Sequence, residues 1–189
     1  MTLDPTKIGF RPLETADLPL LHRWLNTDFV KEWYDSGPPY EEVAAKYAPR
    51  IAGRAPTRSF ITLYGDTPIG YIQTYRIDDY PEYSRYVRAG EEAAGVDLFI
   101  GHADYVHRGL GSAILRRFLR EVVFGAGDAA SCVIGPSVRN RAAIRAYEKA
   151  GFTYLKTVKI PDEDDPEYLM RLARDDLAVE RAADDAAGA

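Results

Sequence analysis

The stretch that decides the fold is Val96 to Ser112, which reads VDLFIGHADYVHRGLGS. Its first residues are apolar apart from Asp97, a pattern typical of a strand. After a short connection, Gly109 and Gly111 stand where a helix begins. Glycines let the backbone approach a ligand closely, and the free N–H groups of a first helical turn favour a pyrophosphate. The stretch therefore predicts a strand, a phosphate-binding turn and a helix.

Two common phosphate-binding motifs are absent from this stretch. A Walker loop would need Gly-x-x-x-x-Gly-Lys-Ser/Thr, which does not occur, and a dinucleotide fingerprint would need a glycine at Ile114. ATP and dinucleotides are therefore poor candidates. His107 and Arg108 add hydrogen-bond donors beside the glycines. Taken alone, the glycine pair is equally compatible with a tight turn.

A second informative segment, residues 136–152, reads PSVRNRAAIRAYEKAGF. Helical spacing places Asn140, Ile144 and Tyr147 along one face, with Asn140 and Tyr147 about 10 Å apart. An amide and a phenol at this spacing could hydrogen-bond a pantetheine arm and reach a thioester sulfur. From the residues alone, a capping Asn and a core Tyr are equally compatible with the pattern.

The rest of the chain alternates strand and helix patterns. Helices are expected over 15–25, capped by Thr15, and over 41–51, 109–123 and 140–150. Strands are expected near 8–12, 60–64, 68–77, 96–101, 131–134, 152–158 and 168–172, with a hairpin turn at Gly65 and a tyrosine-rich loop after residue 77. This order predicts one α/β domain over residues 1–173. Residues 174–189, rich in Ala and Asp, are expected to form a frayed helix or a disordered tail.

Composition narrows the partners. The 189 residues are 46% hydrophobic and 28% charged, which suits one compact core. A net charge of −5 argues against nucleic acid and favours a small cationic substrate. Acidic residues gather in two runs, 78–97 and 162–167, although such runs are often only a solvated face. With no spanning segment and no signal peptide, we expect a cytoplasmic protein that binds no membrane.

Neither cysteine nor histidine chemistry is indicated. The single cysteine, Cys132, has apolar neighbours and is expected in a buried strand rather than as a nucleophile. The three histidines, His22, His102 and His107, lack the spacing of a helical metal-binding pair, so no metal is expected.

Together the two segments resemble the GNAT superfamily of acyltransferases. The resemblance rests on Arg-Gly-Leu-Gly-Ser at 108–112 and on Asn-x-x-Ala-Ile-x-x-Tyr-Glu-Lys-Ala-Gly-Phe at 140–152. It departs at Val106, where the family usually has Gln or Arg. The resemblance implies the GNAT fold, a central mixed and mostly antiparallel sheet flanked by helices, and acetyl-coenzyme A as cosubstrate. It implies cofactor contacts at Leu98, Phe99, Ile100, His107, Arg108, Gly109, Leu110, Gly111, Ser112, Asn140, Ala143 and Tyr147.

Within that superfamily, residues 8–172 look like the aminoglycoside 6'-N-acetyltransferases. The similar segments are 24–26, 32–33, 68–73, 95–101, 104–105 and 140–152. Asp97 supports this subfamily, because siderophore-building lysine N-acyltransferases tend to have His there. Gly135 departs from relatives that carry an acidic residue just before Pro-Ser. The resemblance implies a cationic aminoglycoside acceptor, with substrate contacts at Trp33, Gln73, Tyr75, Asp79, Glu82, Asp97 and Asp162.

Strand alternation sets Asp97 on the side opposite Val96 and Leu98, where its carboxylate can accept a proton from an acceptor ammonium. Tyr147 is the candidate acid for the departing thiolate, and backbone N–H groups of residues 98–100 are candidate oxyanion donors. Three alternatives stay open: a siderophore-type or other small-amine acyltransferase, a protein or peptide N-acetyltransferase, and a noncatalytic acetyl-coenzyme A binder. The sequence does not choose between a monomer and a homodimer.

Overall fold

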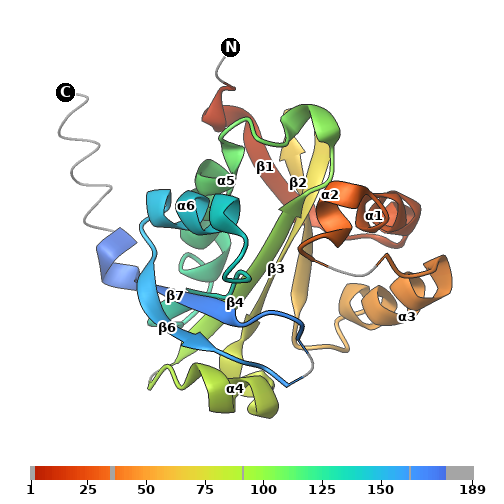
Figure 1. Ribbon diagram of the computed structural model, residues 1–189. Helices are drawn as coiled ribbons and strands as arrows, with labels where there is room; N and C mark the ends of the chain where they lie inside the picture. Colours follow the sequence, from red (N-terminus) through yellow and green to blue (C-terminus); the bar gives the residue numbers. More distant parts are fainter. Residues whose placement is uncertain (1–2, 35–36, 91, 162, 178–189) are drawn as a thin grey trace. The chain divides into compact units, whose positions relative to one another are not determined.

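The computed structural model describes residues 3–34, 37–90, 92–161 and 163–177 (Figure 1). Seven strands form one sheet in the order β1-β2-β3-β4-β5-β7-β6. The chain forms two compact units, Met1–Tyr75 with Val96–Ile114, and Arg76–Gly95 with Leu115–Ala189. Strand β4 (Ala93–Ile100) contributes residues to both. The mixed α/β architecture is confirmed, and the single domain expected over 1–173 stays a prediction.

The first unit begins with an antiparallel meander. Strand β1 (Ile8–Pro12) pairs with β2 (Arg58–Tyr64), which pairs with β3 (Thr67–Arg76). The hairpin between β2 and β3 turns at Gly65, where a φ of +57° favours glycine. Both the hairpin and its turn are as expected from the sequence.

Helices α1 (Leu18–Leu25), α2 (Asp28–Lys31) and α3 (Tyr40–Ile51) complete the first unit. The expected cap at Thr15 is wrong, because Thr15–Asp17 forms a separate 3-10 turn before α1. Asp17 holds this turn: its carboxylate accepts hydrogen bonds from the Glu14 backbone N–H at 2.9 Å and from the Arg11 guanidinium at 2.6 and 2.7 Å. The chain entry to α1 is therefore fixed by an ion pair.

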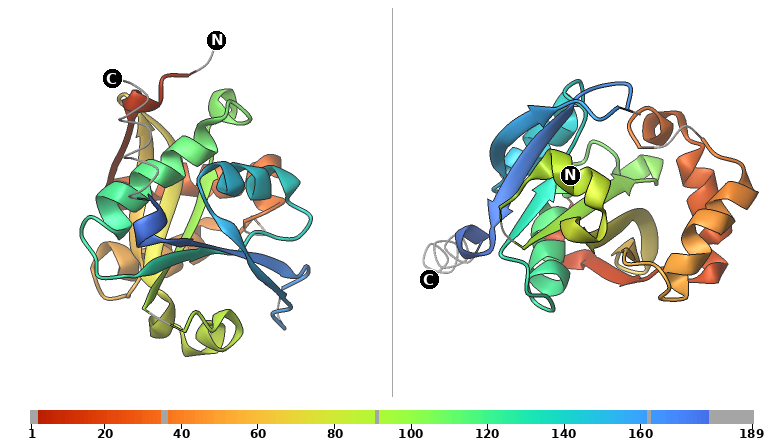
Figure 2. Two further views of the ribbon diagram at one scale, coloured as in Figure 1. Left: turned by 90° about the vertical axis from the view of Figure 1, so that its left-hand side faces the viewer. Right: turned by 90° about the horizontal axis from the view of Figure 1, so that it is seen from below.

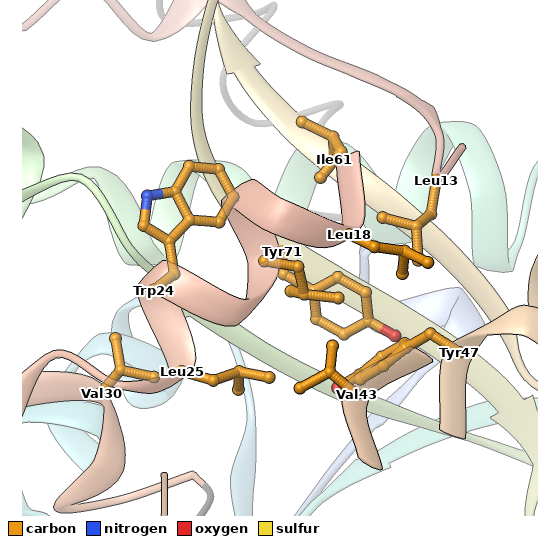
Figure 3. Packing of buried hydrophobic residues seen from close by; sticks show 10 residues of the cluster. Leu13, Leu18, Trp24, Leu25, Val30, Val43, Tyr47, Ile61 and Tyr71 are labelled. Carbon is orange, nitrogen blue, oxygen red and sulfur yellow. The ribbon is translucent and has the colours of Figure 1, made fainter. Parts of the chain in front are cut away.

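The core of the first unit lies where α1 and α3 pack beside β2 and β3 (Figure 3). Its buried side chains are Leu13, Leu18, Leu21, Trp24, Leu25, Val30, Val43, Tyr47, Ile61 and Tyr71. Gly101 belongs to this packing, since a Cβ built there would lie 2.2 Å from Cγ of Trp24. Strand β4 consequently ends against the indole.

In the second unit, the start of β4 pairs in parallel with β5 (Ser131–Ile134) over Ala93 to Gly95. Strand β7 (Glu167–Ala173) pairs antiparallel with β5 and with β6 (Thr153–Val158), and β6 and β7 run side by side in Figure 2. Cys132 is fully buried in β5, as expected.

The helices that include second-unit residues are α4 (Pro81–Val87), α5 (Leu110–Phe118) and α6 (Arg141–Lys149). Helix α5 begins in the first unit and continues as a π-helical turn over Leu119–Val123. None of the described helices combines the length and apolar character needed to cross a bilayer.

Two of the differences from the sequence expectation lie within residues 81–95. Residues 81–87, expected in a loop, form α4, because Pro81 suits a first helical turn and Arg88 ends the helix in the left-handed conformation with φ +46°. Strand β4 starts three residues early, at Ala93, because the small residues Ala93 to Gly95 are buried against β5.

Hydrogen bonds fix the first residue of the expected tail, Arg174, to the residues just before β5. Arg174 donates from its backbone N–H to Ala130 at 2.9 Å and from Nε to Ala129 at 3.0 Å. Residues 174–177 form a helical turn that buries Leu177. The rest of the predicted tail, 178–189, lies outside the described residues.

Gly70 on β3 provides a test of the approach between β3 and β4. A Cβ there would lie 2.3 Å from the Phe99 carbonyl oxygen, whereas one at Gly9 would meet nothing nearer than 3.9 Å. We expect Gly70→Ala to lower the free energy of unfolding by about 1–3 kcal/mol, and Gly9→Ala to change it by less than about 0.5 kcal/mol. Urea unfolding of both variants measures this, and equal effects would contradict the close approach.

Candidate active site

The structure brings three of the predicted substrate residues together. The side-chain amide Nε2 of Gln73 donates a 2.7 Å hydrogen bond to Oδ2 of Asp97, and Tyr75 also hydrogen-bonds that carboxylate. Gln73 and Tyr75 lie on β3 with the same alternation, so both side chains leave the strand on the same face. Asp97 comes from the neighbouring strand, β4. The Asp97 carboxylate therefore accepts hydrogen bonds from two side chains of β3.

Behind Gln73 lies a chain of buried polar groups that the sequence did not reveal. The Gln73 oxygen Oε1 accepts from the Tyr71 hydroxyl at 2.7 Å and from Nη1 of Arg50 at 2.6 Å. The Tyr71 hydroxyl lies 2.7 Å from Oγ of Ser59. Tyr71 shares the alternation of Gln73 and was detectable on that basis, but Arg50, in the last turn of α3, carries no local signal.

Burial controls the protonation of this cluster. Asp97 keeps some solvent access, yet protein atoms crowd its carboxyl group, and this desolvation raises its pKa above the ordinary aspartate value. Hydrogen bonds from Gln73 and Tyr75 and the positive charge of Arg50 act against the rise. Burial also raises the pKa of Tyr71 to about 12, which keeps its hydroxyl protonated and able to donate.

Aromatic rings surround the cluster. Phe99 stacks on Tyr71 with ring centroids 5.7 Å apart, and Tyr34 meets Phe99 edge-on at 4.8 Å. Trp33, predicted as a substrate contact, is one of the exposed large hydrophobic residues among the described residues. The exposed indole is adjacent in sequence to Tyr34.

The turn before α5 fits an anionic group. His107 and Gly109 both have positive φ, +57° and +79°, and a Cβ at Gly109 would meet no atom within 4 Å. His107, Arg108 and Gly109 are exposed, while Leu110 is buried and anchors the helix start. The turn therefore offers two cationic or donor side chains, open space and the first-turn N–H groups of a nine-residue helix. These features suit a pyrophosphate.

On α6 the capping role of Asn140 is confirmed. Its Oδ1 accepts a 3.0 Å hydrogen bond from the Ala143 backbone N–H, which uses the amide oxygen and leaves Nδ2 as the donating end. Tyr147 is partly buried, with its ring 6.5 Å from that of Phe152. The phenol of Tyr147 is therefore supported by one aromatic neighbour and retains some exposure.

The remaining acidic candidates belong to the second unit. Asp79 is exposed in the 3-10 turn before α4, Glu82 is exposed in the first turn of α4, and Asp162 lies outside the described residues. In the part of the chain that is described, no group of three His, Cys, Asp or Glu side chains is placed to hold a metal ion.

The structure adds one acidic residue that the sequence did not single out. A Cβ at Gly135 would lie 2.5 Å from Oε2 of Glu167, so the carboxylate of Glu167 fills the space beside this glycine. The Tyr83 hydroxyl donates to the same oxygen at 3.0 Å. Glu167 thus places a carboxylate beside Gly135, the position at which the sequence was expected to depart from some relatives. Only the register of β7 against β5 could have revealed this.

Comparison with known proteins identifies the family and the fold of this chain. The family model of the acetyltransferase (GNAT) domain matches residues 14–160. The chain is 28% identical over 158 residues to an aminoglycoside N(6')-acetyltransferase type 1 of Klebsiella pneumoniae, covering 82% of this chain and 78% of the relative.

Solved structures of acetyltransferases have a similar fold. The aminoglycoside acetyltransferase AAC(6')-Ib in complex with coenzyme A and kanamycin superposes with a TM-score of 0.81, 30% identity and coverage of 92% of this chain and 99% of that one. A spermidine N-acetyltransferase chimera from Vibrio cholerae and hSSAT, at 19% identity and a TM-score of 0.72, shares the fold.

The pKa of Asp97 has a measurable effect on stability. Because burial raises this pKa above the unfolded value of about 3.9, the folded state holds the proton more tightly, and wild-type stability falls as pH rises through the window between the two values. Asp97→Asn removes this dependence. We expect the stability difference, variant minus wild type, to grow as pH rises from 4 and then to level off.

Urea unfolding across this pH range measures the difference. Asp66→Asn, at the exposed hairpin turn, is the matched control for the loss of one carboxylate. The same pH dependence of the difference in both variants, or a flat difference for Asp97→Asn, would show that burial does not perturb Asp97.

Proposed function

The chain belongs to the GNAT acetyltransferase family, and on that premise we propose that it transfers the acetyl group of acetyl-coenzyme A to the 6'-amino group of aminoglycosides. The observation that carries the proposal is the Asp97 carboxylate, hydrogen-bonded to Gln73 on the neighbouring strand in an aromatic surrounding. The named relatives that cover most of this chain act on the same class of acceptor by their names.

Asp97 is proposed as base and anchor. An aminoglycoside amine arrives as an ammonium ion, and its nitrogen cannot attack the thioester carbon until a proton leaves. The carboxylate of Asp97 attracts the ammonium and accepts this proton, directly or through water. A pKa raised by burial brings the carboxylate closer to the ammonium in proton affinity, which favours the transfer.

Acetyl-coenzyme A is the acetyl donor, and the chain offers three kinds of contact for it. The turn from His107 to Ser112 supplies donors for the pyrophosphate, and Asn140 Nδ2 is available to the pantetheine arm. The pairing of β4 with β5 covers only Ala93 to Gly95, so the backbone of Leu98, Phe99 and Ile100 lies beyond it and is proposed to receive the thioester oxygen.

Tyr147 is proposed as the acid. When the amine nitrogen forms its bond to the acetyl carbon, the carbon–sulfur bond breaks and leaves a thiolate. The phenol of Tyr147 donates its proton to this sulfur. Its partial burial against Phe152 supports a fixed orientation for that donation.

The polycationic acceptor explains the acidic surface. An aminoglycoside carries several ammonium and hydroxyl groups, and Asp79, Glu82 and Asp162 are proposed to bind those distant from the reacting amine. Trp33, Gln73 and Tyr75 are proposed to contact the sugar ring. Glu167 adds a further carboxylate in the second unit, next to the glycine at 135.

Release of the coenzyme A thiol tests the proposal. With acetyl-coenzyme A, we expect turnover with kanamycin and tobramycin, and none with a 6'-hydroxyl aminoglycoside, lysine or hydroxylysine. Asp97→Asn should lower kcat/KM by about 10²–10⁴-fold, while Asp66→Asn should not change it. Turnover of lysine derivatives alone would support a siderophore-type acyltransferase. Tight acetyl-coenzyme A binding without any turnover would support a noncatalytic binding protein.

The acid role of Tyr147 is tested separately. We expect Tyr147→Phe to lower kcat by about 10–100-fold, the lower part of the range for acid catalysis because a thiolate is a good leaving group. The KM for kanamycin should stay near wild type. Tyr154→Phe, which removes the hydroxyl of an exposed tyrosine on β6, is the control. Equal kcat values in the two variants would remove Tyr147 from the mechanism.

A further inference from the structure

Arg50 places a positive charge among the aromatic residues behind Asp97. It lies in the last turn of α3, partly buried, with its guanidinium 4.9 Å from the centroid of the Tyr47 ring. Its hydrogen bonds go to Gln73 Oε1 at 2.6 Å and, more weakly, to the Tyr71 hydroxyl at 3.4 Å, rather than to a carboxylate. The guanidinium is partly withdrawn from water, and its positive charge acts on the Asp97 carboxylate, which points to a role beyond surface charge.

The hydrogen bonds of Arg50 fix the orientation of the Gln73 amide. Arginine can only donate, so the end of the amide that faces it must be the oxygen. The other end, Nε2, is then the group that lies 2.7 Å from Asp97 Oδ2. The direction of the Gln73 to Asp97 hydrogen bond therefore follows from the chemistry of Arg50.

Arg50 differs from the hydroxyl groups in this hydrogen-bond network because it can only donate. The hydroxyls of Ser59 and Tyr71 can each donate or accept, so they could adapt to a flipped amide. A flipped Gln73 would turn its oxygen toward Asp97, and two facing oxygens favour a protonated carboxyl group. Because Arg50 can only donate, it opposes this flipped orientation of the Gln73 amide.

We infer that Arg50 is a positioning residue for the proposed base: through the Gln73 amide it holds the Asp97 carboxylate in its proton-accepting state. This inference rests on the proposed function and extends it to a residue more than one side chain away from the reacting atoms. Arg50 touches neither the acceptor nor the acetyl donor in this scheme.

The other groups that act on Asp97 are accounted for. Gln73 and Tyr75 on β3 donate hydrogen bonds to it, Lys46 on α3 adds a positive charge, and the neutral phenols of Tyr34 and Tyr71 lie close by. The charge of Arg50 and the Gln73 hydrogen bond both lower the pKa of Asp97, against the effect of burial. Loss of Arg50 removes the effect of its charge directly and weakens the effect of the Gln73 hydrogen bond.

The test is the pH dependence of kcat/KM with kanamycin for wild type, Arg50→Gln, Arg50→Lys and the control Arg54→Gln. Arg54 is an exposed arginine four residues further on, so its loss changes the net charge equally. The acid limb reports ionisation of the free enzyme, and the titration of the substrate is common to all four proteins. We expect Arg50→Gln to move this limb about one unit to higher pH, with the activity of wild type approached at high pH.

Arg50→Lys keeps a charge and a donor but lacks the planar fork, so its limb should lie between those of wild type and Arg50→Gln. Arg54→Gln should superpose on wild type, and the KM for acetyl-coenzyme A should be the same in all four. If Arg50→Gln does not fold, Arg50→Lys decides: a limb at higher pH supports the inference, and a limb coincident with wild type contradicts it.

Two further outcomes distinguish failure of the inference about Arg50 from failure of the proposed function. An active wild type whose acid limb does not move in Arg50→Gln, while the stability of that variant falls, would make Arg50 a scaffold residue and overturn the inference. A wild type that turns over none of the aminoglycosides would instead overturn the proposed function.

Discussion

The hydrogen bond from Gln73 to Asp97 is the constraint around which the first unit is arranged. It joins β3 to β4 with a donor–acceptor distance of 2.7 Å, and the same two strands approach closely at Gly70, where β3 has no room for a side chain. Helix α3 packs beside these strands and brings Arg50 to the oxygen of the same amide. Core packing and site chemistry are thus served by the same strand, with Tyr71 buried in the core and hydrogen-bonded to Gln73.

The sequence predicted the parts of the site that lie on regular elements. Strand alternation gave Asp97 a face of its own, and helical spacing aligned Asn140 with Tyr147, whereas Gln73 and Tyr75 were predicted from the family resemblance. The 78–95 region was harder, since Pro81 and Arg88 define a helix whose apolar periodicity is weak. The acceptor class and the coenzyme A contacts were predicted from the family resemblance, because periodicity alone left them open.

What the sequence could not predict is pairing across elements. Arg50 has no neighbour in sequence that hints at Gln73, and only the packing of α3 against the sheet brings them together. Glu167 is similar, because its nearness to Gly135 depends on the register between β5 and β7. Such contacts join residues 23 positions apart in the first case and belong to tertiary structure, where local patterns carry little information.

The contact between Gly135 and Glu167 also limits how this protein can evolve. With the Glu167 carboxylate filling the space beside Gly135, an acidic side chain at 135 would collide with it and repel it. An acidic side chain at 135 would therefore be accommodated best with a smaller or neutral residue at 167.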